Sequence, residues 1–419
     1  MVSVNIGIRN AADNQVCTTD LRKAPWEVDE TPGYGPGSSM WDVEPAGTPR
    51  QGVIPEWYRK ASPEQLHDRI MAAKKLLGDK LVILGHFYQR DEVIQYADYV
   101  GDSFQLAKAA QKHPEAEHIV FCGVHFMAET ADIISGDHQK VVLPNLAAGC
   151  SMADMADIDS VEDAWEQLME VYSDETDTPV VPVTYMNSSA ALKAFCGEHG
   201  GVVCTSSNAE QVLKWAFQQG KRVLFFPDQH LGRNTAKKLG VPLNRMVMWN
   251  PKQPFGGNSN QVLEDAQVIL WQGFCSVHKR FTVQQIQKAH ADYAGQNLRV
   301  IVHPECTMEV VDAADENGST DYILKAVAGA TEPTVFAIGT EINMVNRLAS
   351  QYPHHTIFCL DPVICPCSTM YRIHPSYLAW VLDSIVEGNT VNRIVVPETV
   401  QVYASVALNR MLELAPPAH

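Results

Sequence analysis

The sequence is poor in positive charge. Lysine and arginine supply 32 residues against 49 aspartate and glutamate residues, which leaves a formal net charge of −17. A chain with this excess of negative charge repels the phosphates of nucleic acids and of anionic membranes. We therefore expect neither a nucleic acid nor a membrane among its partners.

The sequence also lacks long apolar runs. None approaches the ~20 residues that a membrane-spanning helix needs, and residues 1–10 lack the apolar core of a secretory signal peptide. Both absences predict a cytoplasmic protein. The 10 cysteines are too sparse over 419 residues for a disulfide scaffold. In a reducing compartment, any cysteine with a function is expected to bind a metal or to act in catalysis.

What the sequence does contain is a recurring unit: a short apolar strand, a turn rich in glycine, serine, histidine or asparagine, and then a helical pattern. The globular part begins with an amphipathic helix from Ser62. Strands are expected at 81–84, 119–122, 140–143, 180–184, 201–204, 222–226, 267–271, 298–302, 334–338 and 355–359. Apolar strands that alternate with helices indicate parallel sheets covered by helices. The fold class is therefore α/β. At ~100–200 residues per domain the length predicts about two to four domains, and we expect three.

Three segments depart from this pattern. Residues 1 to about 60 are rich in proline and glycine, which predicts an extended or disordered leader. The stretch between Ser151 and Thr178 is acidic, and the stretch between Pro251 and Glu264 is rich in glycine and asparagine. Both are expected to be surface insertions without a chemical role.

Three cysteines share one sequence context. Cys275 follows the strand at 267–271 on a turn opened by Gly273, and Cys150 and Cys367 stand in similar turns with a small neighbour and a following hydroxyl residue. A cysteine placed after a strand can point its sulfur into a cavity. The sequence therefore predicts that these three thiols come together.

Three thiols favour an iron–sulfur cluster, or a zinc ion completed by His278 or His303. Each cysteine taken singly can equally be a buried structural residue. That plainer interpretation is kept for Cys122, Cys204 and Cys359, which lie in or at the ends of apolar strands.

Polar side chains gather where the other predicted strands end, and in parallel α/β folds ligands bind at that edge. His86 and Tyr88 follow the first strand, and His303 and Glu305 follow the strand at 298–302. A histidine next to a carboxylate suits proton transfer. A buried His–Tyr pair, or a glutamate in the first turn of a helix, would look the same in sequence.

Several of these groups stand directly before a helical pattern, where free backbone amides and hydroxyls bind anions without lysine. They are Asn187-Ser-Ser189, Ser206-Ser-Asn208 and Gly318-Ser-Thr320. Any one of them alone can be a simple helix cap. Several at one sheet edge favour a phosphate or carboxylate ligand.

A set of motifs stands in order along residues 80 to 412. They are Gly85-His-Phe-Tyr-Gln89, Gly101-Asp-Ser103, Phe126-Met-Ala-Glu-Thr130, Ala148-Gly-Cys150, Val183-Thr-Tyr-Met-Asn187, Thr205-Ser-Ser-Asn-Ala209, Pro227-Asp-Gln-His-Leu-Gly232, Trp271 to His278, His303-Pro-Glu305, Gly318-Ser-Thr320 and Cys367-Ser-Thr-Met370. Together they resemble the quinolinate synthase family of bacterial NAD biosynthesis.

The resemblance implies three similar αβα domains with short parallel sheets, arranged with pseudo-threefold symmetry around a [4Fe–4S] cluster. It suggests an N-terminal extension at 1–60, domain 1 at 61–152 with the C-terminal segment 376–419, domain 2 at 153–275, and domain 3 at 276–375. Cys150, Cys275 and Cys367 would each bind one iron. The fourth iron would be left open as a Lewis acid.

The implied reaction condenses iminoaspartate with dihydroxyacetone phosphate to quinolinate, with loss of phosphate and water. The implied substrate-binding residues are His86, Ser103, Tyr185, Asn187, Ser206, His303, Glu305 and Thr320, and the implied catalytic residues are Tyr185, Glu305, His86, Tyr88 and His278. Glu305 and Tyr185 are expected to transfer protons. A functional link to L-aspartate oxidase is a further expectation.

The sequence departs from compact members of this family in its leader and its two expected insertions. Its Cys365-Pro-Cys367 pair also differs from the Cys-x-x-Cys arrangement of some members. Because the two cysteines stand so close around a proline, we expect only Cys367 to be a ligand. A zinc-dependent hydrolase or lyase and a non-enzymatic iron–sulfur sensor are the alternatives that the cysteines leave open.

Overall fold

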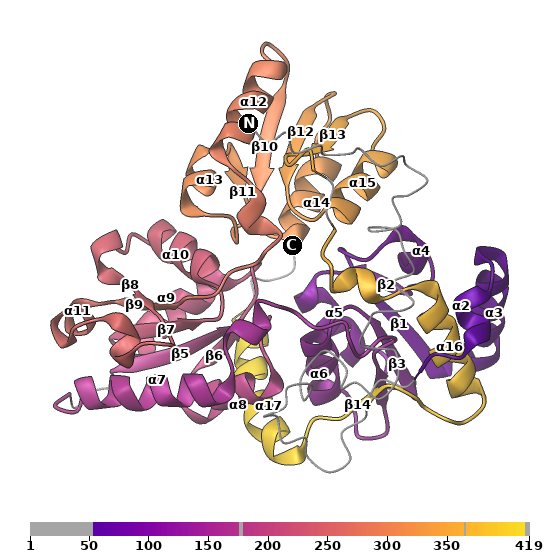
Figure 1. Cartoon of the computed structure of the whole chain (residues 1–419), viewed down its shortest axis with the longest axis horizontal. Helices are drawn as coiled ribbons and strands as arrows, with labels where there is room; N and C mark the ends of the chain where they lie inside the picture. Colours follow the sequence, from indigo (N-terminus) through magenta and orange to yellow (C-terminus); the bar gives the residue numbers. More distant parts are fainter. Residues whose placement is uncertain (1–52, 176–178, 364–365, 415–419) are drawn as a thin grey trace, which may run out of the picture.

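The structure is a computed structural model that describes residues 53–175, 179–363 and 366–414. It confirms the α/β class: the strands form two five-stranded sheets and one four-stranded sheet. Figure 1 shows one lobe for each sheet, and the three lobes meet at the centre of the molecule. Among the described residues, no helix combines the length and the apolar character needed to cross a membrane.

The first sheet has the strand order β14-β4-β3-β1-β2 and is parallel except at β14. The predicted helix from Ser62 is α3, whose first turn is closed by a capping box between Ser62 and Gln65. The elements of this lobe are α2 (Glu56–Lys60), α3 (Pro63–Leu77), β1 (Leu81–His86), α4 (Asp91–Ile94), β2 (Tyr99–Gly101), α5 (Ser103–Gln111), β3 (His118–Cys122), α6 (His125–Ile134), β4 (Lys140–Val142), α16 (Pro375–Val386) and β14 (Arg393–Ile394).

The second sheet has the order β6-β5-β7-β9-β8 and is parallel throughout. Its elements are α7 (Ile158–Val171), β5 (Val180–Tyr185), α8 (Ala190–Glu198), β6 (Val202–Cys204), α9 (Ala209–Gln219), β7 (Arg222–Phe226), α10 (Gln229–Lys238), β8 (Met246–Trp249), α11 (Asn260–Asp265) and β9 (Val268–Trp271). The last helix of the chain, α17 (Glu398–Glu413), packs against α8 and β6 of this lobe.

The third sheet has the order β11-β10-β12-β13 and is also parallel. Its elements are α12 (Val283–Asp292), β10 (Leu298–Val302), α13 (Met308–Ala313), β11 (Glu316–Asn317), α14 (Thr320–Ala328), β12 (Val335–Gly339), α15 (Ile342–Gln351) and β13 (Thr356–Cys359). Alternate residues of its strands belong to two separate buried clusters, one on each face of the sheet.

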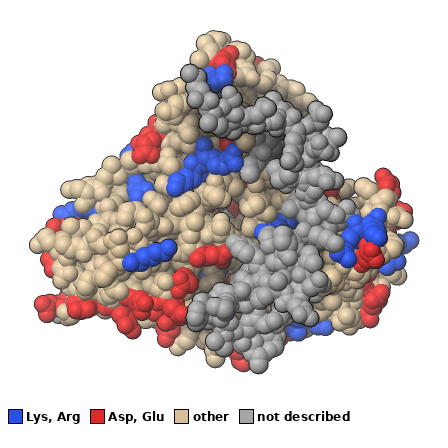
Figure 2. Space-filling model, viewed as in Figure 1, with Lys and Arg blue, Asp and Glu red and all other residues tan. Residues whose placement is uncertain are grey.

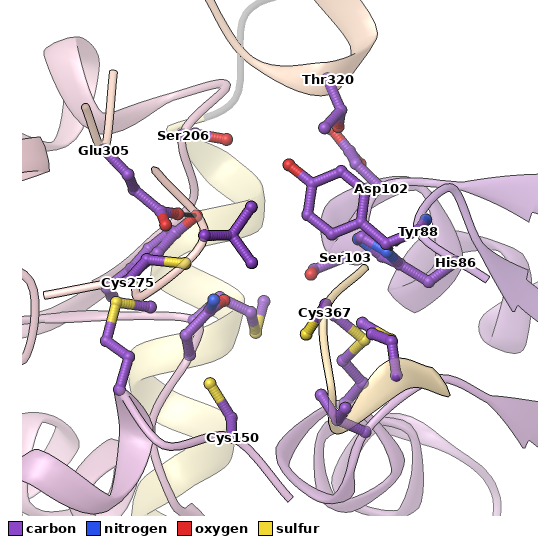
Figure 3. Close-up of a pocket in the computed structure, with 18 of the residues that line it drawn as sticks. His86, Tyr88, Asp102, Ser103, Cys150, Ser206, Cys275, Glu305, Thr320 and Cys367 are labelled. Carbon is purple, nitrogen blue, oxygen red and sulfur yellow. Dashed lines mark hydrogen bonds between the residues drawn. The ribbon is translucent and has the colours of Figure 1, made fainter. Parts of the chain in front are cut away.

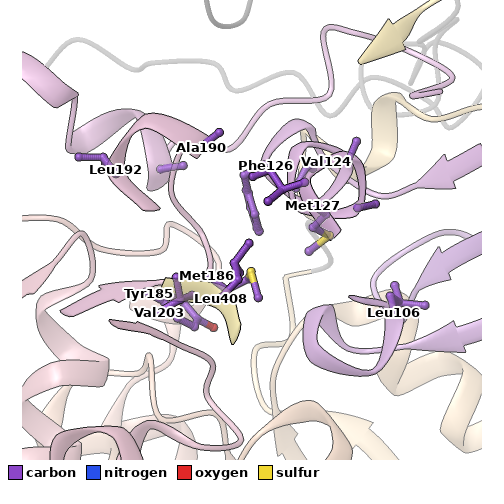
Figure 4. Packing of buried hydrophobic residues seen from close by; sticks show 14 of the residues in the cluster. Leu106, Val124, Phe126, Met127, Tyr185, Met186, Ala190, Leu192, Val203 and Leu408 are labelled. Atoms are coloured by element: carbon purple, nitrogen blue, oxygen red, sulfur yellow. The ribbon is translucent and has the colours of Figure 1, made fainter. Parts of the chain in front are cut away.

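The first two lobes share one continuous hydrophobic core. Figure 4 shows part of it, where Phe126 and Met127 of α6 lie near Met186 and near Ala190 of α8. Apolar contacts of this kind make the lobe interface a part of the core. The residue-by-residue limits of the three domains stay a prediction, and the contacts of α16 and α17 are divided between the first lobe and the second.

The expectation of two surface insertions was wrong. The acidic stretch after Ser151 forms α7, whose residues Val161, Ala164 and Leu168 are buried at helical spacing. Its acidic side chains lie on the opposite, solvent side, and Figure 2 shows acidic residues along the edge where α7 runs. The second stretch contains α11, which buries Leu263.

The structure describes the predicted leader only from residue 53 onward. Helix α2 begins at Glu56, and the hydroxyl of Tyr58 in this helix donates a hydrogen bond to Asp383 at 2.7 Å.

Candidate active site and metal centre

A cavity lies where the three lobes meet, at the carboxyl ends of β1, β5, β9 and β10. Its volume of ≈ 70 Å³ is several times the ~10–15 Å³ that one water molecule needs. Every residue predicted as a site residue lines it: His86, Tyr88, Ser103, Cys150, Tyr185, Asn187, Ser206, Cys275, His278, His303, Glu305, Thr320 and Cys367. Their separate roles stay predictions.

The three predicted ligand cysteines come from three different parts of the chain. Cys150 follows β4, Cys275 follows β9, and Cys367 precedes the short helix at Met370–Arg372. In Figure 3 their sulfurs face the same open space. By contrast, Cys122, Cys196, Cys204 and Cys306 are fully buried and do not line the cavity. Cys365 lies outside the described residues.

Burial controls the ionisation of these thiols. It raises the pKa of Cys150 to about 12, and it raises the pKa values of Cys275 and Cys367, with a further contribution from the neighbouring thiols to Cys275. A metal that replaces the thiol protons would bind all three as thiolates.

The turn before Cys275 is fixed by a glycine. Gly273 forms a bridge to Asp228, and a Cβ at this position would collide with the carbonyl oxygen of Pro227. Trp271, at the end of β9, donates from its indole nitrogen to the Met155 carbonyl at 2.7 Å. These contacts hold the chain that delivers Cys275 to the cavity.

Glu305 is the centre of a buried hydrogen-bond network. Its Oε1 accepts from the hydroxyl of Tyr185 at 2.6 Å, and its Oε2 lies 2.9 Å from Nδ1 of His278. Burial alone would raise the pKa of Glu305, but His278, His303 and the two hydrogen bonds outweigh it and lower the pKa to about 2. Glu305 is therefore an ionised carboxylate in a buried site.

The network continues through a residue that the sequence did not single out. The hydroxyl of Thr340 lies 2.8 Å from the Tyr88 hydroxyl and 3.3 Å from Nε2 of His278. Thr340 therefore connects Tyr88, in the first lobe, to the Glu305 network. It stands directly after β12, so the rule that selected the other strand-end residues also applied to it.

The two remaining histidines are neutral. Burial, with Arg347 as a further cause, lowers the pKa of His86 to about 3, and burial with His278 lowers that of His303 to about 3. Nδ1 of His86 accepts from the Tyr88 amide at 3.1 Å, and Nδ1 of His303 accepts from the Glu305 amide at 3.3 Å. Each neutral ring therefore has its proton on Nε2 and can donate from there.

Three helix starts border the cavity. Ser103 is the first residue of α5, Thr320 is the first residue of α14, and Ser206 stands shortly before α9. Figure 3 shows their side chains around one opening. Two bonds fix the arrangement: Asp102 accepts from the Ser207 hydroxyl at 2.9 Å, and Gln105 donates to Asp321 at 2.8 Å. Such converging helix starts suit an anion.

Comparison with known proteins decides the family. A family model described as "Quinolinate synthetase A protein" matches residues 68–413. The chain belongs to this family. It is 68% identical to the quinolinate synthase of Corynebacterium glutamicum over 385 residues, which covers 92% of this chain and 96% of the relative.

Two further relatives agree with this assignment. The quinolinate synthase of Streptomyces coelicolor is 55% identical and covers 84% of this chain and 89% of the relative. That of Anoxybacillus flavithermus is 51% identical and covers 87% and 97%. Membership of the quinolinate synthetase A family confirms the resemblance given by the motifs, and with it the expectation that the chain is an enzyme.

Within this family member, a second group of possible metal ligands overlaps the thiols. Ligand atoms of Cys275, His278 and Glu305 all lie within 4.8 Å of one another. A thiol, an imidazole and a carboxylate suit zinc as well as iron. His278 and Glu305, however, already bond to each other and to Tyr185, which favours a role in proton transfer.

Proposed function

We propose that the chain is a quinolinate synthase that condenses iminoaspartate with dihydroxyacetone phosphate to quinolinate, with loss of phosphate and water, in de novo NAD biosynthesis. The observation that supports it best is the cavity itself, which combines three thiols, an ionised carboxylate between tyrosine and histidine, and converging helix starts. The domain limits 61–152 with 376–419, 153–275 and 276–375 belong to the same proposal.

Cys150, Cys275 and Cys367 would hold a [4Fe–4S] cluster. The donor set fits this group, because three thiols face one space and come from turns that only the folded chain brings together. When bound, a cluster with three protein ligands supplies an open iron that acts as a Lewis acid toward a substrate oxygen or nitrogen.

Glu305 and Tyr185 are the proposed proton-transfer pair. Glu305 is ionised and can accept a proton from a substrate carbon or nitrogen. Burial, followed by the charge of Glu305, raises the pKa of Tyr185 well above its usual value, so its hydroxyl stays protonated and can donate. His278 is hydrogen-bonded to the other carboxylate oxygen of Glu305 and can return to the pair the proton that Tyr185 donates.

The substrates would bind in the cavity, next to the helix starts. Ser103, Ser206 and Thr320, at or near three helix starts, would hold the phosphate and carboxylate groups, with Asn187 beside them. His86 and His303 can donate from Nε2, and Tyr88 can donate from its hydroxyl. This arrangement lets a chain of net charge −17 bind anions without relying on lysine.

The cellular setting is part of the proposal. Iminoaspartate is the product expected of an L-aspartate oxidase, so a functional link between the two enzymes follows from the proposed substrate. A cluster held by thiolates is suited to the reducing cytoplasm.

The test is metal analysis of anaerobically purified protein. We expect broad visible absorption and about four irons and four sulfides per chain. Cys275→Ala should lose the iron, the absorption and the synthase activity, whereas Cys122→Ala, a change at a buried cysteine away from the cavity, should keep all three. A fully iron-loaded Cys275 variant would overturn the ligand assignment.

A zinc enzyme is the second candidate, because Cys275, His278 and Glu305 lie close enough to share one ion. It predicts a colourless protein with one zinc per chain that tolerates oxygen. The same analysis separates the two candidates.

A further inference from the structure

A buried carboxylate stands behind one of the three thiols. Glu341 directly follows Thr340, is 0% exposed, and is the N-cap of α15. It accepts hydrogen bonds from neutral groups: the Asn343 amide at 2.8 Å, Nδ2 of Asn343 at 2.9 Å and the Cys367 amide at 3.2 Å. The sequence did not single it out, and it is not among the residues that line the cavity.

The two oxygens of Glu341 serve two different elements. Oε2 accepts from the first turn of α15, through the amides of Asn343 and Met344. Oε1 accepts from the backbone amide of Cys367, which lies 26 residues further along the chain. Asn343, in turn, donates from Nδ2 to the carbonyl of Tyr88 at 3.3 Å. Glu341 therefore joins the third lobe to the Cys367 turn and, through Asn343, to the Tyr88 segment.

Capping alone does not explain a glutamate at this position. Serine, threonine, aspartate and asparagine are the preferred N-caps because their short side chains reach back to the first turn. A buried carboxylate also has a high desolvation penalty, and burial raises the pKa of Glu341 to about 7. Glutamate has one methylene more than aspartate. This extra length lets the carboxylate cap α15 and also accept a hydrogen bond from the Cys367 amide.

We propose that Glu341 is a positioning residue for the third thiol. By holding the Cys367 amide it sets the direction of the Cys367 side chain toward the cavity. The positioning part stands on the hydrogen bonds of the chain itself. The part that concerns the cluster rests on the proposed function.

The first experiment uses the full-length, metal-free protein. Cysteine alkylation by iodoacetamide, followed by peptide mass spectrometry, compares Cys367 with Cys150 and Cys275 in the same molecule. Glu341→Gln should raise the alkylation rate of Cys367 several-fold and leave the other two unchanged. Glu341→Asp, which keeps the charge but is too short to reach, should do the same.

The control is Asp157→Asn at the N-cap of α7, which should leave all three rates unchanged. An unchanged Cys367 rate in Glu341→Gln would overturn the proposal. So would an equal rise at all three cysteines, because that result reports general loosening. If Glu341→Asp behaves as wild type while Glu341→Gln does not, charge is responsible and positioning is refuted.

The second experiment uses anaerobically purified protein with its cluster. Glu341→Gln should release iron to a chelator faster than wild type, because the turn that carries Cys367 is held less firmly. An unchanged release rate would overturn the part that concerns the cluster. If wild-type protein contains no cluster, the proposed function fails, and the alkylation rates still decide whether Glu341 positions Cys367.

Discussion

Burial shifts the pKa values of the histidines and the tyrosines of the cavity in opposite directions. It lowers the pKa values of His86 and His303 and raises those of Tyr88 and Tyr185, so all four are neutral at pH 7. Glu305 is the exception, because it accepts bonds from tyrosine and histidine that stabilise its charge. Glu305 is thus the charged acceptor that orients the Tyr185 hydroxyl and the His278 ring.

Thr340 offers a test of the network that links these groups. Thr340→Val keeps the side-chain shape but removes the hydroxyl between Tyr88 and His278. We expect kcat to fall about 10-fold or more, as for one lost hydrogen bond of ~1.4 kcal/mol, with a smaller change in KM. Steady-state kinetics would show it. Thr340→Ser should restore most of the rate, and equal activity of the valine and serine variants would exclude the link.

Ser206 tests the anion-binding wall. Ser206→Ala should weaken the binding of dihydroxyacetone phosphate by ~1–3 kcal/mol, the worth of a hydrogen bond to a charged group, and should affect iminoaspartate less. KM values for the two substrates, each varied at saturation of the other, provide the comparison. Ser189→Ala, at the cap of α8, is the matched control because Ser189 does not line the cavity. Equal losses for both substrates would contradict the assignment.

At the residue scale, the sequence predicted which side chains lie at the edges of the sheets, but it did not predict their hydrogen-bond partners. His86, Tyr185, Cys275 and Glu305 were selected because they follow apolar strands, and the carboxyl ends of parallel strands share an edge. The partners of Glu305 come from positions 27 and 120 residues away, which no local pattern predicts. Thr340 and Glu341 were overlooked although they also follow a strand, because they stand in no recognised motif.

At the scale of elements, every central strand was predicted, as were the edge strands β6 and β13, and the strands that were missed are all at sheet edges. β2, β8, β11 and β14 each terminate a sheet. An edge strand pairs on one side only, so it can be short and partly exposed. β11 has two polar residues, and Tyr99 and Val100 of β2 are exposed. β8 is apolar, but only alternate residues of it are buried.

The acidic helix α7 was missed for a different reason. Its net composition is that of a solvated loop, but Val161, Ala164 and Leu168 recur at helical spacing and are buried. Composition averages over the two faces of a helix, whereas periodicity separates them. The hydrophobic period was therefore the better guide here.

Gly197 tests how α17 is held. A Cβ at Gly197, on α8, would collide with the carbonyl oxygen of Tyr403 on α17. Gly197→Ala should destabilise the protein by ~1–3 kcal/mol, as overpacking does, and should increase hydrogen exchange in α17. Urea unfolding and hydrogen-exchange mass spectrometry measure the two effects. Gly136→Ala, whose Cβ would meet only the movable His138 ring and Gln139 side chain, should change little. A stable Gly197 variant with an unchanged α17 would refute this packing.

At the scale of the whole molecule, no lobe contains the candidate site alone. The first and second lobes share a hydrophobic core, whereas the third packs in two separate clusters, one of which includes Phe87 of the first lobe. The third lobe contacts the others through polar bonds such as Tyr88–Thr340 and Tyr185–Glu305. These bonds lie in the cavity, so its contents are expected to affect how firmly the third lobe is held.

Removal of the proposed cluster should therefore loosen the centre of the molecule and leave the sheets intact. A group bound by three turns stabilises the state in which the turns are close together, and its binding energy adds to the stability of that state. After anaerobic chelation we expect a melting temperature lower by at least ~5 °C, since each kcal/mol shifts Tm by ~2–4 °C in domains of this size.

Hydrogen exchange shows where the loosening occurs. It should rise at the turns of Cys150, Cys275 and Cys367 and around Thr340, and stay unchanged in the buried strands β3 and β7. The variant Cys122→Ala, treated with the same chelator, should show the same pattern, because its change lies outside the cavity. Uniform exchange across all three lobes, or none at the three turns, would mean that the lobes are held together by their protein contacts and that the cavity contents contribute nothing to the assembly.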